Sequence, residues 1–447
     1  MLFTTDNQTL EDLSIFGRQE EDSVYGIFHH TYTRGGTVLL EEMFRYPLSD
    51  EAAINRRSGI IQYFAANGTV FPFSPVLLDA AESYLANVDE RSQLTDTPDT
   101  IGKKISQLIA SDGDTVFIYK GINALVELLH GMRDFIGSLS IPEGHGYQAD
   151  KEAIWALLSA PDLVPVLTPT HKGKPPHAVM VEYDGLFRFR CRKIMQALLR
   201  HIYYIDVYLA VAKVALERGF SFPAAQPRHQ HMVKLEGVYH PLLKQAVANT
   251  IEITPGNNVI FLTGANMAGK STFMKSLSIA LYLAHMGFPV PAAHMVFSVL
   301  DGIYTTINLP DNLGMGASHF YAEVLRVKKI ANELSQGKSL FVLFDELFRG
   351  TNVKDAYEAT VAITRAFANK RNSLFVVSTH IMEAGEALRQ HCSNVRFVYL
   401  PTRMNGNTPV YTYLLENGIT DDRHGMVIIN QEGILEILKS GIANTTK

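Results

Sequence analysis

Hydrophobic residues in the first part of the chain recur three and four positions apart, the spacing of an amphipathic helix. This pattern occurs in residues 52–68, 74–88 and 119–139, and over the longest run, 191–220. The last run ends at Gly219, and Pro223 follows it, as is common just beyond the end of a helix. We therefore expect an α-helical domain over residues 1–232.

The pattern changes after residues 221–233, which are rich in proline and polar residues and are expected to form a linker. Short runs of β-branched and aromatic residues then alternate with helix-like stretches. These runs lie in residues 257–264, 339–346, 372–380 and 394–400. Such alternation predicts an α/β domain with a buried, largely parallel sheet, which we place at residues 233–447.

Composition narrows the class of protein. The 447 residues allow two or three domains, with 47% hydrophobic and 19% charged residues as in globular proteins. The net charge of −5 gives no overall attraction to nucleic acid, so any DNA contact requires a local basic surface. Cys191 and Cys392 lie far apart, without the spacing of a metal site, and fit a reduced cytosolic protein better than a disulfide framework. With neither a signal peptide nor a membrane span in the pattern, we expect a cytoplasmic protein without membrane contact.

A phosphate-binding motif opens the second domain. Residues 264–271 read G-A-N-M-A-G-K-S and fit G-x-x-x-x-G-K-[ST], between an apolar strand at 259–262 and a helix-like run at 272–285. Lys270 is expected to reach the β- and γ-phosphates, and the Ser271 hydroxyl to bind Mg²⁺. The alternative, a chance glycine-rich turn, is disfavoured because both flanking elements are present.

Two further strand ends carry candidate chemistry. Residues 340–344 form an apolar run that ends in Asp345, a candidate Mg²⁺ ligand, and Glu346, which would orient or deprotonate the attacking water. A second apolar run precedes His380, which could sense the γ-phosphate or position the water. The alternatives are a strand that ends in exposed acids and a structural histidine.

These residues resemble the MutS family of DNA mismatch-repair ATPases. Residues 263–272 are similar to that family's T-G-P-N-M-G-G-K-S-T, with Ala265 and Ala268 as departures. The resemblance implies an ABC-like P-loop ATPase domain that uses ATP and Mg²⁺. Its implied nucleotide-binding residues are Gly264, Ala265, Asn266, Met267, Ala268, Gly269, Lys270, Ser271 and Thr272.

Two more segments carry the resemblance. Residues 345–351 are similar to D-E-x-G-R-G-T, with Phe348 in place of a glycine, and residues 316–323 are similar to G-R-S-T-F-x-x-E. The resemblance implies that Ser318 faces the γ-phosphate bound in a partner subunit, and hence a homodimer. A helix N-cap is the alternative role for Ser318.

The helical part resembles the family's lever domain in residues 31–57 and 205–212. The Phe-x-Glu that wedges beside a mispaired base in full-length members has no counterpart outside residues 344–346, in the predicted buried strand. We expect the mismatch-recognition and connector domains to be absent and the clamp to be reduced. Val247 stands where relatives stack an aromatic ring on adenine.

Candidate DNA contacts come from two basic groups. They are Arg188, Arg190, Arg192 and Lys193, expected in the first turn of the long helix, and Lys103 with Lys104. A solvated charged face is the alternative for each. His229 and His231 are expected to be exposed and not to bind metal.

The sequence thus predicts a MutS-like, ATP-dependent DNA-binding protein of mismatch repair or recombination, in which hydrolysis resets a dimeric clamp. An ATP-switched protein scaffold without DNA binding is the alternative. An ABC transporter ATPase is disfavoured because the L-S-G-G-Q signature is missing. Steep salt dependence of DNA binding would separate the first two.

Overall fold

The computed structural model describes residues 3–17, 22–95, 111–168, 175–307, 319–405, 408–420 and 433–442. They form two compact units, each built from more than one stretch of the chain. Unit 1 comprises residues 1–27, 44–58 and 217–447, and unit 2 comprises residues 28–43 and 59–216. The boundary between residues 232 and 233 stays a proposal, and the units are described separately.

Unit 2 is helical among the described residues, as the periodicity predicts. Its residues come from α3 (Arg34–Arg45), α4 (Glu51–Ala66), α5 (Pro75–Ala86), α7 (Ser111–Ser138), α8 (Gln148–Leu158), α9 (Val164–Leu167), α10 (His177–Gly185) and α11 (Arg192–Arg218). Helices α5 and α7 approach closely at Gly121, where an added Cβ would lie 2.2 Å from Tyr84 Cβ. Glycine is therefore required at this crossing.

Unit 1 contains a six-stranded sheet in the order β12-β9-β4-β8-β7-β6. The strands are β4 (Val259–Gly264), β6 (Gly302–Thr306), β7 (Leu340–Phe344), β8 (Leu374–Ser378), β9 (Val395–Leu400) and β12 (Glu416–Asn417). All pairs are parallel except β12 with β9. The prediction of a helical part followed by a largely parallel α/β part is confirmed.

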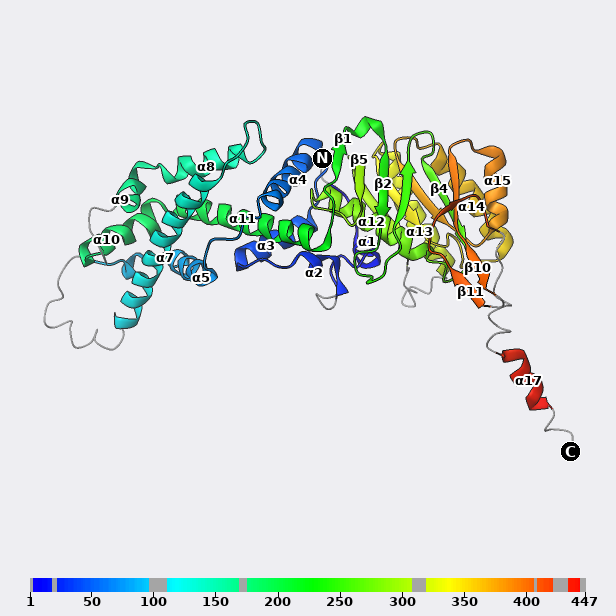
Figure 1. The fold of residues 1–447 in the computed structure, drawn as a ribbon, viewed down its shortest axis with the longest axis horizontal. Coiled ribbons are helices and arrows are strands. Elements are labelled where there is room, and N and C mark those ends of the chain that lie inside the picture. The colour runs from blue at the N-terminus through cyan, green and yellow to red at the C-terminus, as the bar shows by residue number, and fades with distance from the viewer. Residues whose placement is uncertain are drawn as a thin grey trace. The chain divides into compact units, whose positions relative to one another are not determined.

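Helices of unit 1 lie beside this sheet, and Figure 1 labels them. They are α12 (Lys270–His285), α13 (His319–Ser335), α14 (Val353–Ala368) and α15 (Met382–His391). Strands β4, β7 and β8 are buried throughout, as expected for a sheet covered on both faces. Phe367 of α14 stacks on Phe344 and Phe375, with ring centroids 5.7 and 4.7 Å away.

A second sheet has the order β1-β5-β2-β3. Its strands are β1 (Ala224–Gln226), β2 (Val233–Val238), β3 (Asn249–Ile253) and β5 (His294–Ser298). Residues 221–233, expected to be a linker, therefore contribute a strand, and that prediction was wrong. The side chain of Asn55 secures β1, since it donates to Ala225 O at 2.9 Å and accepts from Ala225 N at 3.0 Å.

The remaining described elements are short. They are α1 (Asn7–Asp12), α2 (Val24–Phe28), β10 (Thr402–Asn405), β11 (Thr408–Tyr411) and α17 (Ile434–Ile442), with η2 (Glu90–Ser92), η3 (Pro161–Leu163), η4 (Leu186–Arg190) and η5 (Arg228–Gln230). Helix α1 packs against β6. Among the described helices, none has the length and apolar character needed to cross a membrane.

Candidate nucleotide-binding site

Three adjacent parallel strands bring the candidate residues to one edge of the six-stranded sheet. Strand β8 lies between β4 and β7. The three strands are in register near their carboxyl ends, where Leu262 pairs with Ser378 and Phe344 with Val377. Loops that follow parallel strands meet at this edge, which is where open α/β sheets bind ligands. The phosphate loop, the acidic pair and His380 are therefore neighbours.

The phosphate loop uses left-handed backbone at several positions. Gly264 has a φ of 149°, Met267 of 68° and Gly269 of 97°. At Gly269 an added Cβ would also lie 2.9 Å from the ring of Tyr413. Helix α12 begins at the next residue, and the first N–H groups of a helix have no partner within it. The loop and helix start together form an anion-binding cradle.

Lys270 lies inside this cradle, with only 5% of the residue exposed. Its Nζ donates to Gly264 O at 2.8 Å and to Ala265 O at 3.1 Å. Burial lowers its pKa, while the nearby charges of Asp345 and Glu346 act in the opposite direction. The ammonium group is therefore held at the centre of the loop by carbonyl oxygens that a phosphate group could replace.

Asp345 contacts the phosphate loop directly. Ser271 Oγ donates to its Oδ2 at 2.5 Å, and its backbone N donates to Thr306 O at 2.9 Å. Burial raises the pKa of Asp345. The other carboxylate oxygen, Oδ1, is buried and has no hydrogen-bond partner among the described residues. The Ser271 hydroxyl and the Asp345 carboxylate, with its unpartnered Oδ1, are the kind of oxygen ligands that Mg²⁺ prefers.

Glu346 is held by the side chains of His380 and Arg349. His380 Nε2 lies 2.6 Å from its Oε1, and Arg349 Nη1 lies 3.5 Å from its Oε2. The hydrogen bond from His380 is the main reason that the pKa of Glu346 falls to about 2. Glu346 also has a left-handed φ of 53°, a strained conformation of the kind that clusters at functional sites.

A cavity of about 830 Å³ opens beside the loop. One wall comes from the phosphate loop and the other from residues 238–249. His240 lines it, and burial lowers its pKa to about 4, so its ring is neutral at pH 7. Val247 and Tyr413 line it as well. The side chain of Asn249 links the second wall to residues 413–415, since it donates to Tyr413 O at 2.9 Å and accepts from Leu415 N at 2.8 Å.

The structure thus brings together most of the residues predicted for the site. Those within hydrogen-bond reach of one another or on the cavity wall are Ala265, Asn266, Met267, Gly269, Lys270, Ser271, Thr272, Asp345, Glu346 and His380, with Gly264 at the end of β4. Ala268 is buried within the loop. Ser318 lies outside the described residues. Arg349 and Tyr413 were not proposed as site residues, although Arg349 lies in the segment 345–351 that resembles D-E-x-G-R-G-T.

Comparison with known proteins places the C-terminal part of the chain. Residues 260–443 match the family model described as MutS domain V. This part of the chain is similar to domain V of MutS proteins. The resemblance that the phosphate loop suggested is confirmed.

Three curated relatives are each named DNA mismatch repair protein MutS. The protein of Anaplasma phagocytophilum (strain HZ) is 31% identical over 232 residues, which are 51% of this chain and 28% of the relative. That of Halalkalibacterium halodurans is 27% identical over 271 residues (58% and 31%), and that of Persephonella marina 29% over 236 residues (52% and 27%). The chain therefore matches about a third or less of each relative.

One departure from the MutS pattern has a visible cost. Phe348, which stands where the quoted MutS motif has glycine, adopts a left-handed φ of 65°. A bulky residue is rarely found there. The residue is 3% exposed, and its ring packs against Phe320 with centroids 5.8 Å apart. Packing against α13 therefore compensates for the strained backbone.

The basic cluster proposed for DNA contact is divided by the structure. Arg188 lies in η4, not in the first turn of α11, and its side chain is fully buried in an ion pair with Asp184. It cannot reach a DNA phosphate, and that expectation was wrong. Arg190 and Lys193 are exposed, while Arg192 is half-buried and donates to a backbone carbonyl. Lys103 and Lys104 lie outside the described residues.

Proposed function

We propose that this chain is a Mg²⁺-dependent ATPase of the MutS type. The observation that carries the proposal is the contact of Ser271 with Asp345 beside a phosphate loop wrapped around Lys270. A P-loop serine and an acid at the end of another strand of the same sheet are the pair that holds Mg²⁺ in P-loop NTPases. The match to MutS domain V supports the same assignment.

The loop binds phosphate and orients it. Backbone N–H groups at the start of α12 and the Lys270 ammonium would contact phosphate oxygens, and the cavity beside the loop has room for a nucleoside. Ser271 and Asp345 would hold Mg²⁺. When bound, the ion neutralises charge that develops on the phosphates.

Glu346 orients the attacking water and accepts a hydrogen bond from it. A carboxylate with a pKa of about 2 is a weak base at neutral pH, so positioning is the stronger contribution. His380 and Arg349 fix the carboxylate from two sides. They keep one face of Glu346 turned to the cavity that its side chain lines.

We further propose that ATP controls DNA binding in a homodimer, with Ser318 completing the partner's site and hydrolysis resetting the clamp. The support is the printed name of the relatives, DNA mismatch repair protein. The net charge is −5 and Arg188 is buried, so DNA contact would rest on exposed residues such as Arg190 and Lys193. Such contacts would recognise the DNA backbone and carry little sequence information.

Steady-state ATPase assays on purified protein test the first proposal. Lys270→Ala should abolish nucleotide binding. Glu346→Gln should keep binding and lower kcat by roughly 100-fold or more. Glu358→Gln, an exposed change of the same chemistry on α14, is the matched control and should hydrolyse normally. Wild-type rates in the Glu346→Gln variant would refute the role assigned to Glu346.

Fluorescence anisotropy with matched, mismatched and branched duplexes tests the second proposal. Binding that changes with ATP and weakens steeply with salt would support a DNA clamp. ATP hydrolysis without binding to any duplex at low salt would contradict it. The result would then favour an ATP-switched protein scaffold.

A further inference from the structure

The N-terminal segment of the chain extends the six-stranded sheet beyond its edge strand. Thr4 pairs in parallel with Gly302 of β6. Its N–H donates to Asp301 O at 2.8 Å, and its carbonyl accepts from Ile303 N at 3.1 Å. An added Cβ on Gly302 would lie only 2.3 Å from Thr4 O. A segment nearly 300 residues away in sequence is therefore joined closely to the edge of the candidate ATPase sheet.

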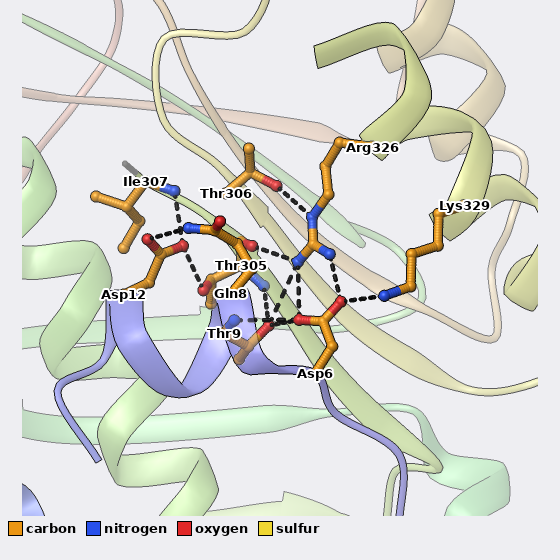
Figure 2. Close-up of polar contacts among 9 residues, drawn as sticks. All are labelled: Asp6, Gln8, Thr9, Asp12, Thr305, Thr306, Ile307, Arg326 and Lys329. Carbon is orange, nitrogen blue, oxygen red and sulfur yellow. Dashed lines mark hydrogen bonds and ion pairs between the residues drawn. The ribbon is translucent and has the colours of Figure 1, made fainter. Parts of the chain in front are cut away.

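Asp6 and Arg326 form the centre of a partly buried polar cluster, drawn in Figure 2. Asp6 caps α1 by accepting from Thr9 N, and its carboxylate forms a bidentate ion pair with the guanidinium of Arg326 in α13. Lys329 adds a contact of 2.6 Å. Although burial alone would raise the pKa of Asp6, these cations hold it far below its usual range.

Arg326 also donates hydrogen bonds to β6. Its Nη2 donates to Thr305 O at 2.6 Å, and its Nε donates to Thr306 Oγ1 at 3.2 Å. From the other side, Asp12 Oδ2 accepts from Thr305 Oγ1 and from Ile307 N, both at 2.9 Å. The last residues of β6 are thereby fixed by side chains from both α1 and α13, as Figure 2 shows.

Thr306 links the cluster to the candidate catalytic residues. Its carbonyl accepts from Asp345 N at 2.9 Å, and the carboxylate of the same Asp345 contacts Ser271. We propose that Asp6 and Arg326 are positioning residues for Asp345, acting through Thr306. This inference rests on the proposed ATPase function. The N-terminal segment would then be part of the catalytic unit and not only a segment that precedes the helical domain.

The geometry explains why a small displacement would matter. Asp345 must present one oxygen to Mg²⁺ while its backbone stays in register with β6. A misplacement of about 1 Å can lower a rate roughly 100-fold, even when its cause lies away from the reacting atoms. An uncharged or shorter partner for Arg326 would let the end of β6 shift by a fraction of that distance.

The test compares the Mg²⁺ dependence of ATP hydrolysis in the full chain. Asp6→Asn keeps a capping oxygen for α1 but removes the charge, and Arg326→Lys keeps a charge but loses the planar fork. Each should raise the Mg²⁺ concentration for half-maximal activity and lower kcat, by roughly tenfold. ATP binding measured in EDTA should be unchanged. The double variant should be no worse than the single variants, because both changes break one unit.

Arg228→Ala is the matched control. It breaks an ion pair with Asp301, at the opposite end of β6 from Asp345. It should lower the thermal midpoint yet leave the Mg²⁺ dependence unchanged. Thr306→Val serves as a milder variant if the ion-pair variants do not fold, because it removes only the Oγ1 acceptor of Arg326 and should shift the Mg²⁺ dependence in the same direction.

Two failures are distinguishable. If the wild-type chain binds and hydrolyses no ATP, the proposed function fails and the positioning role fails with it. If the wild type is active but Asp6→Asn, Arg326→Lys and Thr306→Val all lower the thermal midpoint without changing the Mg²⁺ dependence, the cluster is structural only. That second result overturns the inference and leaves the ATPase proposal intact.

Discussion

Arg188 should stabilise unit 2 and not contact DNA, because its side chain is buried in an ion pair. Its guanidinium and the Asp184 carboxylate are both fully buried. Asp184 also accepts from Tyr84 Oη at 2.8 Å and from Leu94 N at 2.9 Å, while Arg188 donates to Ser92 Oγ at 2.7 Å. Nearly every polar atom of the pair is thus satisfied inside unit 2. The perturbation is Arg188→Ala, which leaves the carboxylate buried without its cation.

The expected magnitude follows from this burial. Removing one partner of a buried, hydrogen-bonded pair costs about 3–5 kcal/mol, because the remaining charge cannot regain its hydration. A stable domain has only about 5–15 kcal/mol in total. For a domain of this size the loss would lower the thermal midpoint of unit 2 by roughly 6–20 °C. Replacing both residues, as in Arg188→Met with Asp184→Leu, should recover only part of the loss, because Tyr84 Oη and Leu94 N lose their acceptor.

Calorimetry and urea unfolding followed by far-UV circular dichroism would measure the change. Arg190→Ala, an exposed position two residues away, is the control and should shift the free energy of unfolding by less than about 0.5 kcal/mol. A loss below about 1 kcal/mol for Arg188→Ala would refute the argument from burial. If DNA binds at all, Arg190→Ala should reduce the salt dependence of binding, whereas folded Arg188→Met/Asp184→Leu protein should retain it.

Three further predictions concern unit 1. Because burial raises the pKa of Asp345, the free energy of unfolding should increase as the pH falls from the raised pKa to the usual one. For the same reason Asp345→Asn should raise the thermal midpoint of the nucleotide-free protein at pH 7. An unchanged midpoint would contradict this. Gly302→Ala should cost about 1–3 kcal/mol in urea unfolding, since its Cβ would meet Thr4 O. Gly256→Ala, whose Cβ would lie in ordinary contact 3.6 Å from Thr254 Oγ1, controls for the loss of glycine. Phe375→Ala should cost about 3–5 kcal/mol by the same assay, because the ring is fully buried against Phe367; a cost under 1 kcal/mol would show that the core relaxes around the gap.

Local patterns were sufficient where the chemistry lies in one short segment. The phosphate loop spans residues 264–271, and its glycines, lysine and serine could be assigned because the flanking strand and helix are also local. The strand ends that carry Asp345 and His380 were predicted in the same way. Their convergence follows from parallel strands alone, since such strands end at one edge of the sheet.

Long-range pairing could not be read from the sequence. Thr4 lies 297 residues from Asp301, and residues 3–12 have no strong period that would predict a place beside β6. Arg188 was misassigned for a related reason. Four basic residues within six positions resemble a charged surface, and only the buried partner Asp184, in the preceding helix, shows that one of them belongs to the core.

The two adjacent carboxylates show how one chain segment supports two kinds of chemistry. Burial raises the pKa of Asp345, and its Oδ1 has no hydrogen-bond partner in the described part of the chain, so a cation that binds there would relieve an existing cost. Glu346 faces His380 and Arg349, which keep it ionised down to a pKa of about 2. Titratable neighbours whose environments separate their pKa values in this way have separate roles. If Asp345 holds Mg²⁺ as proposed, the binding of this ion should depend on pH through Asp345, while Glu346, proposed to orient the water, stays charged at neutral pH.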